Sequence, residues 1–572
     1  MTGYRVALAR LSDPLLGLAA LLICVPVITV VYHLTLPAGE TWGHLAATVL
    51  PRYVQNTLWL MLAVGIGTLI GGVGTAWLVV MCRFPGRRLF EWALILPLAM
   101  PTYVIAYVYT DFFQVSGPVQ TAIRALTGWS ARDYWFPEIR SLGGAMVLFS
   151  LTLYPYVYLA ARAAFVQQCA CVLEAGRTLG CTPGAAFSRI ALPMARPALA
   201  AGVALVLMET LAEFGAVSYF GVQTFTTGIY RAWFSLGDRV AAAQLSTMLL
   251  AFVVMLLLVE HLTRRGARYF DTSRQVRALS RYELAGWRQW AATGFCLVPV
   301  VLGFALPAGI LVGLAWDGAA GQIGARSLVL ISNSVTLAAV TAVLAVGLGL
   351  MLAYGMRRSA GAVPQVAGRV AGLGYAIPGS IVAVGVLIPA AAFDNALDGW
   401  LRQTFGISTG LLLTGSIAAL VFAYLVRFLA VSLRTIQGGL ERITPSMDAA
   451  AATLGAGRFR TLARVHVPML RGSLLAAFLL VFVDVMKELP ATLIMRPFNY
   501  DTLAVQTYNL AADERLAEAA VPALAIVLVG LIPVIMLSNL IARSRTGHGQ
   551  ARQPAAAPAA GPLSPAGLAP AE

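Results

Sequence analysis

Charged residues are scarce in this sequence. Only 11% of its 572 residues are Asp, Glu, Lys or Arg and 59% are hydrophobic, whereas soluble domains usually have about 25% charged and about 45–50% apolar residues. This balance excludes an ordinary water-soluble protein. Apolar stretches of about 20 residues, the length of a helix that crosses roughly 30 Å of hydrocarbon, predict an all-helical (all-α) polytopic membrane protein surrounded by lipid. We expect twelve spans, at approximately residues 14–35, 56–81, 90–111, 142–166, 196–220, 242–262, 291–315, 331–355, 368–392, 411–434, 473–495 and 520–542.

The usual parts of catalytic and metal sites are also missing. The chain has five histidines and six cysteines, and Cys169-Ala-Cys171 lacks the spacing of a zinc site, so no stable metal site is expected. No segment matches G-x-x-x-x-G-K-[ST], the loop that cradles nucleotide phosphates. We find no paired nucleophile and base and no cofactor motif. The chain is therefore not expected to be an enzyme or to bind a cofactor, and energy for transport must come from a partner or an ion gradient.

Positive charge is in excess, with a formal net charge of +15, but the arginines lie between the apolar stretches. They form no soluble basic domain, so nucleic acid is not expected as a partner. Because Lys and Arg accumulate in cytoplasmic loops, their positions predict that both termini are cytoplasmic. Residues 263–290 then form a basic cytoplasmic linker, and the Pro/Ala-rich residues 546–572 are expected to be a disordered tail.

The sequence contains an internal repeat. Matched positions 275 to 277 residues apart include Asn56 and Asn333, Pro101 and Pro378, Gly180 and Gly455, and Glu213 and Glu488. The chain therefore divides into a first half, residues 1–262, and a second half, residues 291–545, each with six expected spans. An even number of spans makes the repeats parallel and relates them by a pseudo-twofold axis along the membrane normal. This symmetry suggests a pathway between the halves.

A polar segment follows the fourth expected span and recurs after the tenth. Residues 172–193 read VLEAGRTLGCTPGAAFSRIALP, residues 447–468 read MDAAAATLGAGRFRTLARVHVP, and a glycine and a proline stand 13 residues apart in both. Each segment predicts a helical hairpin that breaks at the glycine, which permits a turn costly to other residues. A second helix follows in each, and Pro193 is expected to mark its exit toward the next span.

Three groups in the first hairpin, Glu174-Ala175-Gly176, Leu179-Gly180 and Ile190-Ala191-Leu192-Pro193, resemble the EAA motif. This motif is the cytoplasmic coupling loop of permease subunits in binding-protein-dependent ABC importers. The resemblance implies the type I permease fold, the bacterial inner membrane, and two copies of a cytoplasmic ATPase subunit that bind ATP and Mg²⁺. It also implies that the hairpins couple the ATPase to the permease, through Glu174, Ala175, Leu179, Gly180 and Pro193 in the first hairpin and Asp448, Leu454, Gly455 and Pro468 in the second. The alternative is an interfacial helix pair that merely caps the bundle.

The second hairpin departs from the motif. In the Leu-Gly register Glu174 aligns with Ala449, and the nearest acid is Asp448, one position earlier. A shift of one residue turns a helical side chain by about 100°, so the charged contact is not expected to be the same in both hairpins. His466 replaces a more usual apolar residue and is interpreted as a loop-face contact.

Acidic residues lie inside two matched spans, Glu209 and Glu213 in the fifth and Asp484 and Glu488, with Lys487, in the eleventh. An intramembrane charge costs roughly 2.5–3.5 kcal/mol on insertion scales. These residues therefore either line a pathway or form a structural ion pair through Lys487, and the two roles are compatible. Their net negative charge favours a hard cation over an anion such as sulfate or phosphate.

The segments that begin at Glu209 and Asp484 also resemble the fused two-half permeases of ferric-iron importers, over nearly the whole chain apart from the tail. This resemblance implies ferric iron as cargo and a periplasmic ferric-iron-binding protein as a partner. The rim on which that protein docks would consist of Arg231, Asp238, Arg239, Arg496, Asp501, Asp513, Glu514 and Arg515, although each is as readily an ordinary solvated loop charge. Alternatives that stay open are a permease for thiamine or polyamine and a twelve-span secondary transporter, which would not need duplicated hairpins.

Overall fold

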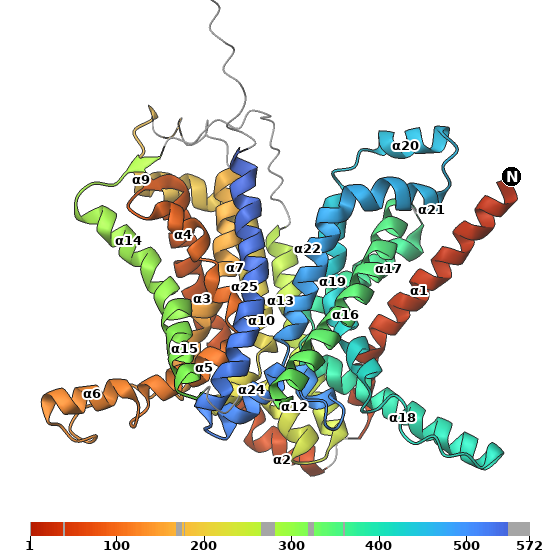
Figure 1. Ribbon diagram of the computed structural model, residues 1–572, viewed down its shortest axis with the longest axis horizontal. Coiled ribbons are helices and arrows are strands. Elements are labelled where there is room, and N and C mark those ends of the chain that lie inside the picture. Colours follow the sequence, from red (N-terminus) through yellow and green to blue (C-terminus); the bar gives the residue numbers. More distant parts are fainter. Residues whose placement is uncertain are drawn as a thin grey trace, which may run out of the picture.

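The computed structural model describes residues 2–37, 40–167, 174, 176, 178–264, 281–318, 325–358 and 361–546. Within these ranges eleven helices are long and apolar enough to cross a membrane. Residues 87–99 and 102–127 form a pair bent by 91°, which makes a twelfth crossing if it is counted as one span. The prediction of an all-helical polytopic membrane protein is therefore confirmed (Figure 1).

The helices before residue 265 are α1 (Thr2–Tyr32), α2 (Glu40–Thr48), α3 (Leu50–Met81), α4 (Arg87–Ala93), α5 (Thr102–Phe113), α6 (Pro118–Thr127), α7 (Leu142–Gln167), α9 (Pro183–Ala186), α10 (Leu192–Ala212), α11 (Gly215–Tyr219), α12 (Phe225–Phe234) and α13 (Arg239–Arg264). Those after residue 280 are α14 (Trp287–Val300), α15 (Leu306–Gly318), α16 (Ala325–Arg358), α17 (Ala362–Leu373), α18 (Gly379–Phe405), α19 (Ile417–Leu440), α20 (Pro445–Thr453), α21 (Arg458–Thr461), α22 (Val467–Met486), α23 (Pro490–Met495), α24 (Leu503–Ala512) and α25 (Leu516–Thr546).

Short elements join the long helices. Three are 3₁₀ turns, η1 (His33–Thr35), η2 (Leu96–Ala99) and η6 (Gly374–Ala376), and three are π-helical turns, η3 (Phe187–Ala191), η4 (Val301–Ala305) and η7 (Leu462–His466). Two parallel two-residue strands, β1 (Cys82–Arg83) and β2 (Tyr282–Glu283), pair between the end of α3 and the start of α14.

Each half has the same central packing. In the first half α3, α7 and α10 pack on one another, and in the second half α16, α19 and α22 do the same. Equivalent polar contacts recur at the matched positions. The Asn56 side-chain amide donates to the carbonyl of Gln223 at 2.9 Å, and that of Asn333 donates to the carbonyl of Asp501 at 3.1 Å. The sequence repeat is thus also a repeat of local contacts.

The outer helices cross between the halves. Helix α1 packs on α17 and α18 of the second half, whereas α15 packs on α5 of the first half and on α25 (Figure 1). The contact between α1 and α18 is close, because a Cβ placed on Gly385 would lie 2.4 Å from the carbonyl oxygen of Pro26. Small residues permit this kind of backbone approach between membrane helices. The two halves are therefore interlocked, and their central helices are held around a shared interior.

The two hairpins lie at one end of the bundle and the expected docking rim lies at the other. Helices α9, α20 and α21 are at the end where α1 begins and α25 ends, and α12 and α24 are at the opposite end (Figure 1). Within the described residues, the hairpins thus lie at the same end of the bundle as residues 2 and 546.

Candidate functional site

The turns of the two hairpins have the same backbone geometry. Gly180 has φ of +80° and Gly455 has φ of +74°, in the left-handed region that favours glycine. In each turn the N–H of the following residue donates to a carbonyl five residues earlier, at 2.9 Å, as in a Schellman helix end. A Cβ on either glycine would have no neighbour within 4 Å, so the backbone conformation alone explains the glycines.

Each turn presents an exposed apolar side chain. Leu179 is 84% exposed and Leu454 is 86% exposed, and Phe459 beside the second turn is 81% exposed. Exposed apolar residues that are grouped at one place mark interaction sites. Glu174 is partly buried, and Ala175 lies outside the described residues.

The second arm of each hairpin continues directly into the next span. Pro193 and Pro468 occupy the second residue of α10 and α22, immediately after the π turns η3 and η7. Pro193 therefore stands where the next span begins, as expected, but the second helix of the hairpin does not end before it. Proline has no N–H to donate, and a π turn just before it locally changes the hydrogen-bond pattern without ending the helix. The apolar helices thus run unbroken through residues 183–212 and 458–486.

The second hairpin is tied to a membrane helix by an ionic cluster. Asp448 accepts from Arg357 Nη2 at 2.8 Å and from Arg357 Nε at 3.0 Å, and its other oxygen lies 2.6 Å from His466 Nε2. Arg357 also donates to the carbonyls of Leu440 and Ile443 at 2.7 and 2.8 Å. His466 is fully buried, which corrects its interpretation as a loop-face contact: its ring holds the acid in place from inside the hairpin.

This cluster lowers the pKa of Asp448. Partial burial acts to raise that pKa, but the hydrogen bonds from Arg357 and His466 and the charge of Arg357 outweigh it, so the pKa lies below its ordinary value of 3.8. The carboxylate is therefore ionised at neutral pH and connects α20 to the end of α16.

The two long helices that leave the hairpins both end within two residues of an acid, Glu213 or Glu488. Helix α10 ends at Ala212 and α11 starts at Gly215, and α22 ends at Met486 and α23 starts at Pro490. Continuous helices over 196–220 and 473–495 are therefore a wrong prediction. The breaks are stabilised because Glu213 accepts the N–H of Ala216 at 3.0 Å, and a carboxylate is favourable at a helix N-terminus.

Glu488 plays the matching part in the second half, with more partners. It accepts the N–H groups of Ala491 at 2.9 Å and Thr492 at 3.0 Å, and the Thr492 hydroxyl at 2.7 Å. Its side chain is 1% exposed and lies 3.2 Å from Arg427 Nη1. Glu213, in turn, accepts the hydroxyl of Thr102 at 2.5 Å.

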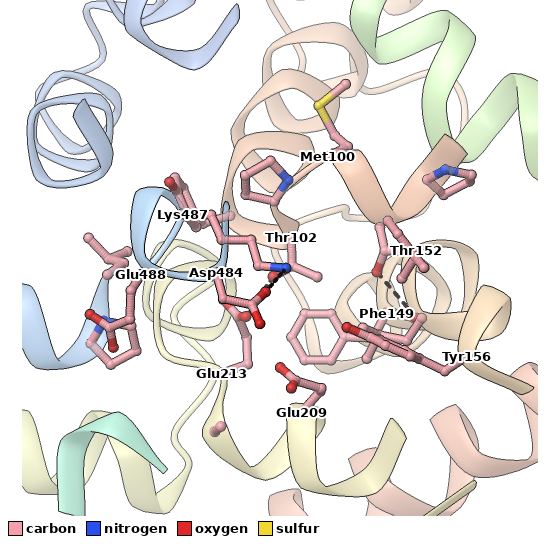
Figure 2. Close-up of a pocket in the computed structure, with 18 of the residues that line it drawn as sticks. Met100, Thr102, Phe149, Thr152, Tyr156, Glu209, Glu213, Asp484, Lys487 and Glu488 are labelled. Atoms are coloured by element: carbon pink, nitrogen blue, oxygen red, sulfur yellow. Dashed lines mark hydrogen bonds and ion pairs between the residues drawn. The ribbon is translucent and has the colours of Figure 1, made fainter. Parts of the chain in front are cut away.

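A cavity of about 110 Å³ lies at these breaks, between the halves. It brings together all five residues predicted for the pathway, Glu209, Glu213, Asp484, Lys487 and Glu488. Figure 2 shows Lys487 directed at Asp484, with Glu209 beside them, and Lys487 Nζ lies 2.9 Å from Asp484 Oδ1. The expected ion pair of Lys487 with Asp484 therefore coexists with a position on the cavity wall.

Several wall residues were not anticipated from the sequence. Arg427 of α19 lines the cavity, as do Tyr156 and Tyr375. Arg427 had a readable signal, because a charge inside a span is itself a sign of function. The tyrosines had none, since tyrosine is common at membrane interfaces and in packed cores.

The expected docking residues lie in the loops around α12 and α24, and several have local structural roles. Asp238 accepts the N–H of Ala241 at 2.9 Å and so caps α13, Arg496 pairs with Asp501, and Arg515 pairs with Glu518 at 2.5 Å. Glu514 lies 3.7 Å from Arg140 of the first half. The remaining members, Arg231, Arg239 and Asp513, are at helix ends.

Comparison with known proteins finds a transport family that matches part of the chain. Residues 63–273 match the family described as "Binding-protein-dependent transport system inner membrane component", and this segment contains the first hairpin and the acids of α10. Over these residues the chain is similar to the inner-membrane permease components of ABC importers, which are transport components and not enzymes.

The curated relatives of this chain differ in how much of it they cover. "Fe(3+)-transport system permease protein FbpB 2" of Haemophilus influenzae is 26% identical over 492 residues, 85% of this chain and 89% of its own. "Ferric transport system permease protein FbpB" of Actinobacillus pleuropneumoniae is 22% identical over 88% of this chain and 73% of its own. "Molybdenum transport system permease protein ModB" of Escherichia coli is 28% identical but covers 34% of this chain and 86% of its own.

Among solved structures, a bacterial ABC transporter involved in the import of the acidic polysaccharide alginate aligns with 46% of this chain and 96% of its own chain. Its TM-score is 0.34 and its sequence identity 15%.

Proposed function

We propose that this permease carries ferric iron across the bacterial inner membrane. The observation that supports this cargo most directly is coverage: the Fe(3+) permease matches 85% of the chain, both halves included, whereas the molybdenum permease matches 34%. The cavity agrees with a cation, because its wall carries four carboxylates, Glu209, Glu213, Asp484 and Glu488, against two cations, Arg427 and Lys487. Oxygen donors suit a hard metal ion.

In this proposal a periplasmic ferric-iron-binding protein delivers the cargo at the end that carries α12 and α24. Two copies of a cytoplasmic ATPase, which hold the ATP and Mg²⁺, bind the hairpins at the other end, with the exposed Leu179 and Leu454 as apolar contacts. Each hairpin arm is continuous with the helix that ends at the cavity. Closure of the ATPase pair then moves both cavity-lining helices at once and alternates access to the cavity between the two sides.

The test is transport by the assembled system. The full chain is reconstituted in proteoliposomes with its ATPase, and uptake of radioactive ferric iron is measured with the iron-loaded binding protein outside and ATP inside. We expect ATP-dependent iron uptake, and no uptake when the ATPase Walker lysine is replaced. Equal or greater uptake of molybdate, sulfate, thiamine or a polyamine with their own binding proteins, and none of iron, would refute the ferric assignment.

A further inference from the structure

The four carboxylates around the cavity differ in what they already bind. Glu213 and Glu488 are occupied by the N–H groups of the helices that follow them, with Ala216, Ala491 and Thr492 as donors at 2.9 to 3.0 Å. Glu488 also holds Arg427. These two acids maintain the helix breaks, and their oxygens are not free for a cargo.

The other two carboxylates occupy matched positions. Glu209 and Asp484 are 275 residues apart, the same interval as Glu213 and Glu488, and they stand in the last turns of α10 and α22. Figure 2 shows their side chains reaching the same space from the two halves. Within the described ranges, Asp484 has an ion pair with Lys487 and no Lys or Arg pairs with Glu209.

Phenolic oxygens complete the wall of this space. Tyr156 and Tyr375 line the cavity together with Glu209. Tyr103 lines the same cavity and is only 4% exposed, yet its hydroxyl has no hydrogen-bond partner in the described part of the chain. A buried hydroxyl without a partner is costly, so this oxygen indicates that the cavity receives a ligand or water with which it bonds.

Lys487 stands where a cationic cargo would stand. Its ammonium lies 2.9 Å from Asp484 Oδ1, and its side chain is 32% exposed, so it is free to swing away on a flexible four-carbon stem. The matched position in the first half is Ala212. The second half therefore supplies a covalently attached cation, Lys487, and the first half has the small Ala212 at the matched position.

We propose that Glu209 and Asp484 form the transit site for a hard trivalent cation and that Lys487 is a built-in counter-ion that the cargo displaces. No group of three or more His, Cys, Asp or Glu side chains able to hold a metal occurs among the residues the structure describes. Two carboxylates with phenolic neighbours make a weak site, which transport requires, because a cargo must leave as readily as it enters. This inference rests on the proposed transport of ferric iron.

The experiment uses Tb³⁺, a redox-inert trivalent cation that prefers oxygen ligands and luminesces when tyrosine nearby is excited. The full chain in lipid nanodiscs, without ATPase or binding protein, is titrated with Tb³⁺. We expect one saturable Tb³⁺ site in the wild type. Glu209→Gln and Asp484→Asn should each raise its dissociation constant for Tb³⁺ at least tenfold. Lys487→Met should lower that dissociation constant at least tenfold, because the competing ammonium is gone.

The control variant is Asp398→Asn, which removes a partly buried carboxylate that pairs with Arg402 and does not line the cavity, and it should leave the titration unchanged. An unchanged titration in Glu209→Gln or Asp484→Asn, or weaker binding in Lys487→Met, would overturn the inference even if iron uptake persists. Stabilisation of the chain against thermal unfolding by molybdate and not by Tb³⁺ would also overturn the inference. The cavity would then be assigned to an anion held by Arg427, whose Nε has no hydrogen-bond partner in the described part of the chain. Failure of iron uptake with the Tb³⁺ results as expected would count against the proposed cargo and leave the cation site standing.

Discussion

Replacement of the apolar residue at the hairpin tip, Leu454→Ser, should weaken binding of the ATPase without weakening the permease. The side chain is 86% exposed in the permease alone, and surface substitutions usually change stability by less than about 0.5 kcal/mol. If docking buries the leucine, its loss removes about 1.5–3 kcal/mol. Since about 1.4 kcal/mol is a factor of ten in affinity, the dissociation constant should rise roughly 10- to 100-fold.

The assay is a titration of fluorescently labelled ATPase onto the full chain in lipid nanodiscs, with thermal unfolding of the same samples. Leu179→Ser tests the other hairpin, and the effects should add, because the proposed assembly places the two tips on separate ATPase copies. Leu412→Ser is the control, since Leu412 is 51% exposed and lies in the loop that follows α18. Unchanged affinity in both hairpin variants, or an equal loss in the control, would refute the reasoning.

Three further outcomes are expected. Gly455→Val should reduce ATPase copurification about 5- to 30-fold and Gly455→Asn much less. The φ of +74° at this position costs a residue with a Cβ about 1–2 kcal/mol, and asparagine tolerates this conformation better than valine does. Equal copurification of the two variants would show that backbone conformation is not the reason for the glycine. Glu488→Ala should cost about 3–5 kcal/mol of stability, because it leaves Arg427 buried and unpaired. Thermal melting measures this loss, and the added substitution Arg427→Met should restore much of the lost stability. No recovery in the double variant would mean that the loss comes from the helix cap. The lowered pKa of Asp448 means that its ionised form stabilises the fold above pH 3.8 and that this contribution is lost as the pH falls through the lower folded pKa. The Asp448→Asn variant should therefore melt at a lower temperature than the wild type at pH 7, and the two melting temperatures should converge in acid. A difference in melting temperature that persists in acid would exclude the ion pair as its cause.

The sequence was sufficient where a local rule determines structure. Positive φ at Gly180 and Gly455 follows from a glycine at the end of a short helix, and the meeting of Glu209 with Asp484 follows from the repeat interval. The helix breaks at Glu213 and Glu488 do not follow from hydropathy, because each acid lies within one long apolar run, although Gly215 and Pro490 shortly follow these acids.

Packing between distant helices was beyond the reach of sequence patterns. The repeat says which helices are equivalent, but it does not say that α1 packs on α17 and α18 or that α15 packs on α25. Arg357 and His466 illustrate the same point, since their contacts with Asp448 depend on where a loop folds back. The side of the membrane on which the hairpins lie stays a prediction from the distribution of arginines.

Fusion of the halves into one polypeptide permits an odd number of charges on the axis. In a homodimer every side chain near the twofold axis occurs twice, so a lysine there would come with a second lysine and cancel two negative charges. Here position 487 is lysine and position 212 is alanine, which leaves one ammonium for two facing carboxylates. A duplicated gene that is free to diverge can thus adjust the charge of its central passage one unit at a time.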